Sequence, residues 1–525
     1  MANRLFKISR APLWPGISAA MLVAVLIFGT LAAVLWRAKG FSALGPFDLA
    51  ALRFTLWQAL LSALLSVLLA VPVARALARR QFPGRAALLA LMGAPFILPV
   101  IVAVLGLLAV FGRKGVFSVA LGWIGFDPVQ IYGLHGVLLA HVFFNLPLAV
   151  RLILQGWLSI PSERFRLAAS LGFSPRDMRH LLEYPMLRGV LPGVFTVIFI
   201  ICLTSFTVVL ALGGGPKATT VELAIYQAFR FDFDLGRAAL LSLMQFGVGA
   251  AAALLALWIA VPGGFGAGLD RAVERWDGRG GLAKLMDAGW IIAAAGFLLL
   301  PLLMIALRGV PGLALLPASI WAAALRSLWL ALVSVALSMG LALALAIAVQ
   351  NLRRRWARGM VEGLGYLTIA ASPLVMGTGL FLMIFPFANP VALALPVTGL
   401  VNALMSLPFV LRALVPALND IESRYGALAD SLGLTGWARL RWLYLPRLRR
   451  PLGFAAGLSA ALSMGDLGVI TLFADPGAAT LPLQLFRLMA AYQMQAAAGA
   501  ALLLLALSLA LFWIFDRGGR IDADT

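Results

Sequence analysis

The sequence predicts an all-α polytopic membrane protein with about 12 transmembrane helices in two parallel six-helix repeats. Of the 525 residues, 62% are hydrophobic and only 12% are charged, whereas a soluble domain has about 45–50% apolar and about 25% charged residues. The mean hydropathy is +0.99. This composition excludes a soluble enzyme and a DNA-binding factor. Two further observations, apolar runs of membrane-spanning length and a residue pattern that recurs at constant separation, give the number and arrangement of the helices.

A helix that crosses the bilayer needs about 20 mostly apolar residues, and the chain contains twelve such runs. They begin near Ile17, Phe54, Ala86, Ile131, Val190, Arg237, Ala288, Leu325, Glu362, Val391, Leu452 and Ala496. The first run follows three basic residues, as in a signal peptide, but no soluble domain comes after it, which favours an uncleaved span. The short apolar stretch 115–126 is the least certain segment, since it fits a re-entrant or interfacial helix as well.

Charge predicts the orientation. The chain carries a net charge of +20 with 41 Lys and Arg residues, and most of these fall in alternate loops that share one side if the N-terminus is cytoplasmic. Positive residues accumulate in cytoplasmic loops, so both termini are predicted to be cytoplasmic. The same rule explains the basic charge without any nucleic-acid partner. Trp36, Trp290 and Trp513 near span ends predict contact with membrane lipid.

An internal repeat divides the chain. Three pairs of residues are 261 positions apart and a fourth pair is 260 apart; the pairs are Pro147 and Pro408, Gly172 and Gly433, Pro185 and Pro446, and Thr220 and Thr480. Six spans per half is an even number, so both halves insert the same way up, and a shared pathway is expected between them. The predicted halves are residues 1–285 and 286–525.

The most informative segments are the loops 153–189 and 413–450, which follow the fourth span of each half. Both predict helix, turn, helix, with Gly172 and Gly433 in the left-handed turn. Ser174 and Thr435 are expected to cap the second helix, and the prolines at 185 and 446 to stop it. Such short helices outside the membrane are marginal alone. Either they lie on lipid headgroups, or they dock in a groove of a cytosolic partner; two copies in register favour docking.

These loops resemble the conserved cytoplasmic motif of ABC importer permeases: Glu-Ala-Ala, three residues, Gly, nine residues, Ile-x-Leu-Pro. Gly172 with Leu182-x-Tyr184-Pro185 matches it, as does Gly433 with Leu443-x-Leu445-Pro446, but Arg166 and Ala427 replace the motif Glu. The resemblance implies a type I ABC importer fold whose loops dock into two copies of a cytosolic ATP-binding subunit, which would hold ATP and Mg while this chain binds no cofactor itself. The implied coupling residues are Arg166, Ala168, Gly172, Pro185, Ala427, Ala429, Gly433 and Pro446.

A permease with two fused halves resembles the iron(III) and thiamine importers, and the stretches 141–147, 212–227 and 462–469 resemble thiamine permeases. The resemblance implies a bacterial inner-membrane protein that imports thiamine and its phosphates from a periplasmic substrate-binding protein. An iron(III) importer permease is the alternative, followed by an ion-coupled secondary transporter. A secondary transporter needs embedded charges for ion coupling, and Asp466 is the one clear candidate.

A few polar residues fall within the predicted spans. Asp466 falls in the eleventh span, where a carboxylate is costly and should face the bundle interior; it either attracts a cationic substrate or makes a helix-packing contact. His141, Asn145 and Asn402 lie on the two fourth spans and either line the pathway or, as is more common, hydrogen-bond between helices. No metal site is predicted, since the few His residues and the lone Cys202 have no ligand spacing. No nucleophile–base pair is present, which predicts a transport subunit rather than an enzyme.

Overall fold

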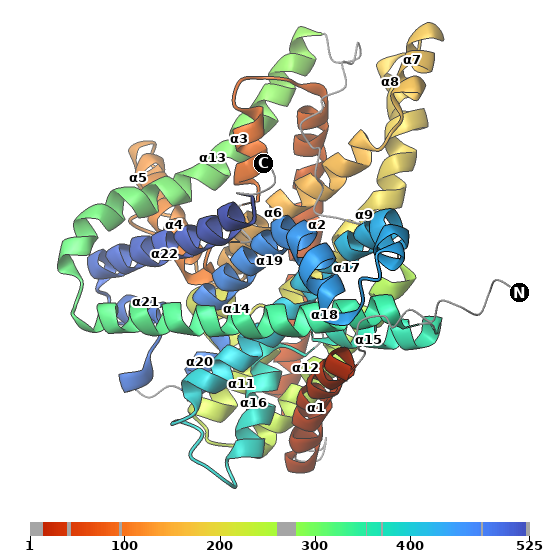
Figure 1. Ribbon diagram of the computed structural model, residues 1–525. Helices are drawn as coiled ribbons and strands as arrows, with labels where there is room; N and C mark the ends of the chain where they lie inside the picture. The colour runs from red at the N-terminus through yellow and green to blue at the C-terminus, as the bar shows by residue number, and fades with distance from the viewer. Residues whose placement is uncertain are drawn as a thin grey trace, which may run out of the picture.

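The computed structural model describes residues 14–38, 44–93, 97–259, 280–352, 354–368, 371–473 and 476–520. The described residues form helices and no strands (Figure 1). Eleven helical stretches among them are long and apolar enough to cross a membrane. The predicted all-α polytopic membrane fold is therefore confirmed. The basic residues that precede the first span lie outside the described residues.

The described residues of the first half form twelve α-helices. They are α1 (Trp14–Arg37), α2 (Pro46–Arg79), α3 (Arg85–Leu91), α4 (Val100–Phe111), α5 (Val116–Trp123), α6 (Leu134–Leu158), α7 (Ser162–Ser170), α8 (Pro175–Met178), α9 (Tyr184–Leu203), α10 (Thr207–Leu212), α11 (Val221–Arg230) and α12 (Leu235–Trp258). A π-helical turn, η3 (Arg179–Glu183), joins α8 to α9, and a short 3-10 turn, η4 (Pro216–Ala218), precedes α11.

The second half follows the same order of elements. They are α13 (Gly281–Gly312), α14 (Ser319–Asn351), α15 (Arg355–Leu367), α16 (Pro373–Ile384), α17 (Ala394–Ser431), α18 (Gly436–Arg439), η7 (Leu440–Tyr444), α19 (Leu445–Gly465), α20 (Gly468–Phe473), η8 (Pro476–Ala478), α21 (Leu481–Ala490) and α22 (Met494–Arg520), with a 3-10 turn, η6 (Leu313–Leu315), after α13. The π-helical turns η3 and η7 begin 261 residues apart, as do α9 and α19. The predicted boundary after residue 285 lies in the first turns of α13, and the division into two permease halves stays a prediction.

Two predicted spans differ from the structure. The run predicted to start near Glu362 is not one span: α15 ends at Leu367, and α16 begins at Pro373 after the Ser372 side chain accepts a hydrogen bond from the Val375 N–H (3.2 Å). A proline at the first helical position, preceded by a serine cap, starts a new helix. In the other half, the span predicted near Ala86 begins only at α4, after the short α3.

The stretch 115–126 contains the separate helix α5, which follows α4 after a break at residues 112–115. Phe117 of α5 packs against Phe111 of α4 with ring centroids 5.6 Å apart. Most of the apolar surface of α5 is exposed, including Trp123. The segment is thus a short helical extension of α4 rather than an independent span.

The first helix of each half packs on the opposite half. Helix α1 packs against α14 and α16, while α13 packs against α2 and α4 as well as against α22. Small residues allow this close approach: a Cβ on Gly379 of α16 would lie 2.5 Å from the Thr30 Cβ of α1, and one on Gly106 of α4 would lie 2.8 Å from the Pro301 carbonyl oxygen of α13. Small residues at helix contacts are typical of membrane bundles. The two halves are therefore interlocked rather than merely adjacent.

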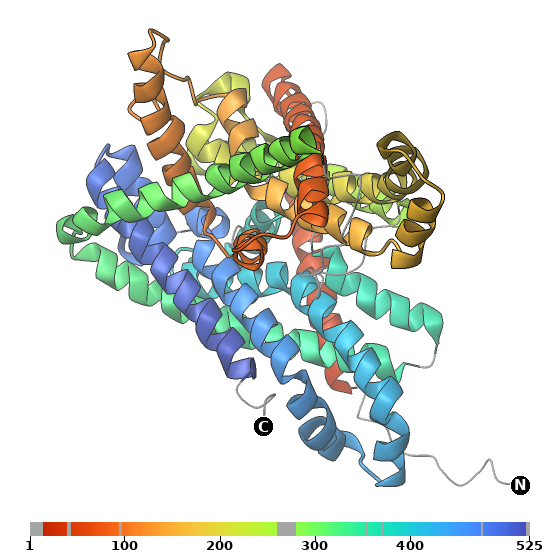
Figure 2. The ribbon, with the colours of Figure 1, turned by 90° about the horizontal axis from the view of Figure 1, so that it is seen from above.

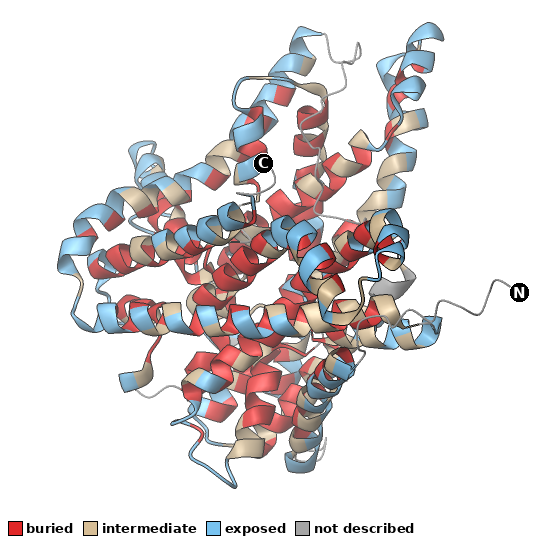
Figure 3. Ribbon diagram, in the orientation of Figure 1, coloured by how far each residue is buried: buried red, intermediate tan, exposed pale blue. Residues whose placement is uncertain are grey.

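Burial follows the pattern expected of a bundle in lipid. Figure 3 shows buried residues at the centre of the molecule and exposed residues along the outer helices. Large apolar side chains are exposed on α1, α2, α13 and α14. So much exposed apolar surface indicates contact with lipid rather than with water. Trp36, Trp290 and Trp513 are all exposed, as their predicted contact with lipid requires.

Candidate functional site

Two similar helix–turn–helix elements, which we call elbows, lie in equivalent places: one follows α6, and the other begins in the last turns of α17. The first elbow comprises residues 162–183 and the second residues 423–444. Both lie in the right half of Figure 1 and of Figure 2, which is turned by 90° about the horizontal axis, while α5 lies at the left in both views. The elbows therefore occupy the same end of the molecule, which we call the elbow end.

The turn in each elbow is made by a left-handed glycine. Gly172 has φ 67° and Gly433 has φ 68°. In each, the residue after the glycine closes the turn through its backbone: the Phe173 N–H donates to the Ala168 carbonyl (3.0 Å), and the Leu434 N–H donates to the Ala429 carbonyl (2.9 Å). This six-to-one bond is the Schellman motif. The predicted left-handed turn at both glycines is confirmed, and the two alanines lie inside the turn.

The helix after the turn begins differently in the two elbows. The Ser174 side chain accepts from the Asp177 N–H (3.3 Å), and the Asp177 carboxylate accepts from the Ser174 N–H (2.8 Å), which completes a capping box. Thr435 occupies the same cap position but makes no side-chain cap hydrogen bond. Ala438 stands where a reciprocal acidic side chain is needed. The predicted cap is thus confirmed for Ser174 and wrong for Thr435.

The prolines at 185 and 446 do not stop a helix. Each lies at the start of the next α-helix, directly after a π-helical turn, so that helical backbone runs from Pro175 to Leu203 and from Gly436 to Gly465. A proline has no N–H to donate, and a π-turn changes the pairing of the backbone at the point where that donor is missing. The prediction of a stop was wrong, and the elbows are instead continuous with α9 and α19.

Ion pairs brace each elbow in place of the missing motif Glu. In the first elbow, buried Glu183 pairs with Arg75 of α2 (2.9 Å). In the second, the buried side chain of Arg439 pairs with Asp430 (2.6 Å) and with Glu422, and the Tyr444 hydroxyl donates to Glu422 (2.9 Å). The first elbow is thus tied to a transmembrane helix, whereas the contacts of the second join its own two helices and Glu422, the residue just before it on α17.

Each elbow presents a pair of exposed leucines that sequence analysis did not single out. Leu167 and Leu171 in the first elbow, and Leu428 and Leu432 in the second, are between 57% and 66% exposed. The pairs are four residues apart, so each shares one helix face, and they correspond at a separation of 261. Arg166 and Ala427 are exposed on the same helices. The internal repeat could have identified these leucines. Both pairs recur at the repeat separation, and the neighbouring alanines already fill the interior of each elbow, which leaves the leucines at the surface.

At the centre of the first half, polar side chains are satisfied by one another. The His141 Nδ1 lies 2.9 Å from the Ser62 hydroxyl and its Nε2 lies 2.7 Å from the Ser205 hydroxyl. The Asn145 amide donates to the His141 carbonyl (2.9 Å) and to the Cys202 sulfur (3.3 Å). His141 and Asn145 are each only 3% exposed. In this conformation both residues therefore hold helices together, in agreement with the alternative that they form hydrogen bonds between helices.

The second half repeats this arrangement with other side chains. Asn402 corresponds to His141, and with its amide oriented to satisfy its surroundings it donates to the Asp466 carboxylate (3.3 Å) and accepts from the Ser463 hydroxyl (3.1 Å). Asp466 corresponds to Ser205. The structure thus brings Asn402 and Asp466 together, and separately brings His141 and Asn145 together. No contact between the two groups is seen among the described residues.

Asp466 does not lie within a helix. It follows α19 in a break before α20, where its carboxylate accepts from the Gly468 N–H (3.1 Å). A Cβ on Gly465 would lie 3.1 Å from Pro99 at the start of α4, and one on Gly468 would lie 3.6 Å from the Cβ of Pro373 at the start of α16. Helices α4 and α16 occupy equivalent places in the two halves, so this break lies between them at the midline of the molecule.

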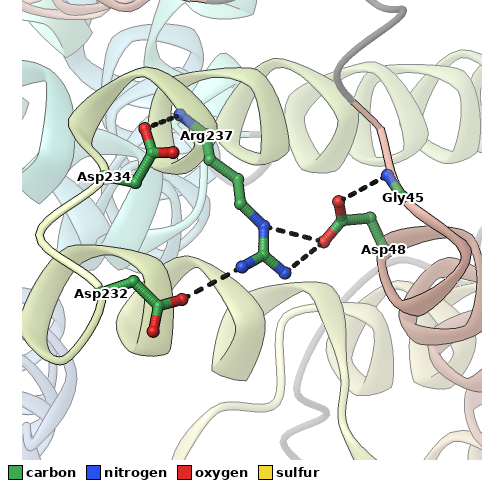
Figure 4. A network of polar contacts seen from close by, with 5 residues as sticks. All are labelled: Gly45, Asp48, Asp232, Asp234 and Arg237. Atoms are coloured by element: carbon green, nitrogen blue, oxygen red, sulfur yellow. Dashed lines mark hydrogen bonds and ion pairs between the residues drawn. The ribbon is translucent and has the colours of Figure 1, made fainter.

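At the end of α2 opposite the elbows, a second group of charges links α2 to α12 (Figure 4). Arg237 pairs with Asp48 (2.7 Å) and with Asp232 (3.0 Å), and its backbone N–H donates to Asp234 (3.0 Å). Asp48 and Arg75 are 27 positions apart on α2, so about 40 Å separate this group from the pair made by Arg75 at the elbow end. The two ends of α2 are therefore each fixed by an arginine–carboxylate pair.

Loss of the Arg237 side chain is predicted to destabilise the fold. Arg237→Ala leaves Asp48, which is 2% exposed, as an unpaired buried charge, at a cost of about 3–5 kcal/mol. The melting temperature of the purified protein in detergent should fall clearly. Arg53→Ala removes an exposed arginine from α2, the helix that carries Asp48, and should leave the melting temperature unchanged. Equal melting temperatures for both variants would contradict the assigned role of the pair.

Several named permeases are similar to this chain over almost its whole length. It is 40% identical over 545 residues to the thiamine transport system permease protein ThiP of Escherichia coli, with all of both chains covered. It is 40% identical over 523 residues to ThiP of Brucella abortus (96% of this chain and 95% of the relative), and 37% identical over 479 residues to that of Haemophilus influenzae (87% and 86%).

The chain belongs to the thiamine transport system permease family.

The names of these relatives agree with the predicted transport subunit and with its membrane fold. No protein-family model matches this permease. A more distant relative is a probable sulfate transport system permease protein from Helicosporidium, 29% identical over 203 residues, which are 38% of this permease and 74% of the relative. Within the described residues of the permease, no group of three or more His, Cys, Asp or Glu side chains is arranged to hold a metal ion.

Proposed function

We propose that this permease is the membrane-spanning subunit of an ATP-driven importer that moves thiamine and its phosphates from a periplasmic binding protein to the cytoplasm by alternating access. The thiamine substrate is supported by full-length identity of 40% to permeases that carry this substrate in their names. The coupling to ATP is supported above all by one observation, the pair of elbows with equal glycine turns at one end of the molecule. ATP and Mg²⁺ belong to two copies of a separate cytosolic subunit.

The elbows have a surface on which such subunits could dock and displace them. Each presents two exposed leucines on one helix face, and a small apolar face of this kind fits a hydrophobic groove. Ala168 and Ala429 are buried, so among the predicted coupling residues they shape the turn, whereas Arg166 and Ala427 lie at the surface. Each bracing ion pair keeps its elbow rigid, so a force applied to the leucines moves the whole element.

Continuous helical backbone carries that movement to the midline. Because the chain remains helical from Pro175 to Leu203 and from Gly436 to Gly465, displacement of an elbow displaces the far end of α9 or α19. Those ends are the breaks that contain Ser205 and Asp466. ATP-driven approach of the two elbows thus becomes a relative movement of the two halves around the midline, which is alternating access by rocking halves.

The proposed orientation follows from charge. Positive loops mark the cytoplasmic side, which places the elbows and both termini in the cytoplasm of a bacterial cell and the permease in its inner membrane. The exposed end of α5 and the turn at 231–234 then face the periplasm, where a binding protein delivers the substrate.

Iron(III) import and ion-coupled transport are less well supported. Iron(III) prefers oxygen ligands, and the midline carboxylate Asp466 already accepts from a backbone N–H, while both nitrogens of His141 contact hydroxyl groups. An ion-coupled transporter gains nothing from two matched elbows outside the membrane. Uptake is the direct test: in a bacterial strain that lacks this gene, restoring it should restore uptake of labelled thiamine and leave iron(III) uptake unchanged. Restored iron(III) uptake without thiamine uptake would refute the proposed substrate.

A further inference from the structure

One buried carboxylate has no cationic partner. Among the described residues, four carboxylates are less than 9% exposed. Three of them pair with arginine: Asp48 with Arg237 (2.7 Å), Glu183 with Arg75 (2.9 Å) and Asp287 with Arg80 (2.7 Å). The fourth is Glu222 in the first turn of α11, which is 0% exposed and makes no ion pair within the described residues.

The surroundings of Glu222 supply only weak polar contacts. Among the described residues, neither carboxylate oxygen has a partner with full hydrogen-bond geometry, and neither has the Oε1 atom of Gln245. The side chains of Gln245 (α12) and Ser372 (α16) lie against Glu222, but the Gln245 amide nitrogen donates to the Leu203 carbonyl (3.0 Å). A buried carboxylate with no partner is expensive. Such a group either holds a proton or meets a positive charge in another state of the protein.

Glu222 lies beside the same helix end as Asp466. Ser372, against which Glu222 packs, is the cap of α16, and Gly468 in the turn of Asp466 approaches Pro373, the next residue along that helix. Helix α11 is held on α16 by Phe229 and Phe381, whose ring centroids are 4.6 Å apart. Glu222 comes from the first half of the chain and Asp466 from the second. Glu222 and Asp466, neither of which makes an ion pair within the described residues, therefore meet the start of α16 from opposite halves.

We propose that Glu222 is a binding residue of the transport pathway and that, together with Asp466, it takes the organic cation of the substrate. This inference rests on the proposed function. A thiazolium ring carries a permanent positive charge and has no N–H at its quaternary nitrogen, so it is attracted by charge rather than by donated hydrogen bonds. The Glu222 oxygens, which have no full hydrogen-bond partner among the described residues, suit such a cation, and Asp466 adds a second negative charge from the other half. Because Glu222 is fully buried here, the site opens only when α11 and α16 separate as the halves move.

The test compares a charged with an uncharged substrate in one strain. Glu222→Gln keeps the size of the side chain and removes its charge. The uptake ratio of labelled thiamine to a labelled analogue in which an uncharged thiophene replaces the thiazolium ring should fall at least about tenfold, the equivalent of a single modest charge interaction. Because both substrates are measured on the same protein, the ratio does not depend on how much protein reaches the membrane.

Two further variants sharpen the result. Glu222→Asp retains the charge and should keep the preference for thiamine even where total uptake falls. Asp127→Asn removes one exposed carboxylate distant from α16 and should leave the ratio unchanged. A wild-type ratio in Glu222→Gln would overturn the proposal and leave Glu222 as a protonated packing residue, whereas failure of the wild type to take up thiamine at all would overturn the proposed function instead.

Discussion

Replacing Leu171 and Leu432 together by Glu is expected to abolish binding of the ATP-hydrolysing subunit while the permease still folds. Both side chains are exposed, at 63% and 66%, so a charged replacement costs little in the isolated protein. In a complex, each Glu would lose its hydration within an apolar groove, and truncation of a central interface residue alone costs about 2 kcal/mol or more. Two such sites should reduce co-purification of the ATPase to below about a tenth of the wild-type amount.

The matched control retains an apolar side chain at both positions. Leu171→Met together with Leu432→Met preserves hydrophobic area and flexibility, so association should stay close to that of the wild type. The amount of permease in the membrane, measured for both variants, separates lost docking from lost folding. Normal ATPase association in the Glu variant would show that these leucine pairs are not the contact surface.

The second large effect is expected at the elbow glycines. Gly172→Val or Gly433→Val should reduce thiamine uptake to background with insertion preserved. A Cβ at either glycine meets no atom within 4 Å, so the effect would come from the backbone alone. The left-handed conformation costs a residue with a Cβ about 1–2 kcal/mol and is least tolerated by β-branched residues. The turn should therefore change shape and misdirect the leucine face.

Two controls identify the backbone as the cause. Asn visits the left-handed region readily, so Gly433→Asn should retain most of the uptake. Gly189→Val places the same side chain in open space on α9, at a glycine without a positive φ, and should be tolerated. Wild-type uptake in Gly172→Val and Gly433→Val alike would contradict a role for the elbow turn in coupling.

The elbows could be predicted from sequence because their geometry is local. A glycine turn and a serine cap act over four or five residues, and Gly172, Gly433 and Ser174 formed them as expected. The cap expected at Thr435 did not form, and its reason is local too, because Ala438 has no acidic side chain to complete it. The path of the chain past the prolines was harder to predict. Proline at 185 or 446 favours a helix stop in isolation, yet the π-helical turn before it lets the chain continue into the bundle.

The pathway was harder to predict because partners lie far apart in sequence. Asp466 could be recognised as unusual from its apolar surroundings, but its place in a break between α4 and α16 depends on contacts across the two halves. Glu222 was not selected, because in the sequence it falls between two predicted spans, where a charge is ordinary. Only its complete burial and the absence of an arginine partner within the described residues distinguish it.

Transport by the purified permease in lipid vesicles tests the central claim most directly. Vesicles with the permease alone, and vesicles that also carry the ATPase subunit, are given labelled thiamine on its binding protein, with ATP on the elbow side or with an imposed ion gradient. Accumulation is predicted only where ATPase and ATP are both present. Equal accumulation by the permease alone, driven by the ion gradient, would contradict the proposal that the elbows couple transport to a separate ATP-hydrolysing subunit.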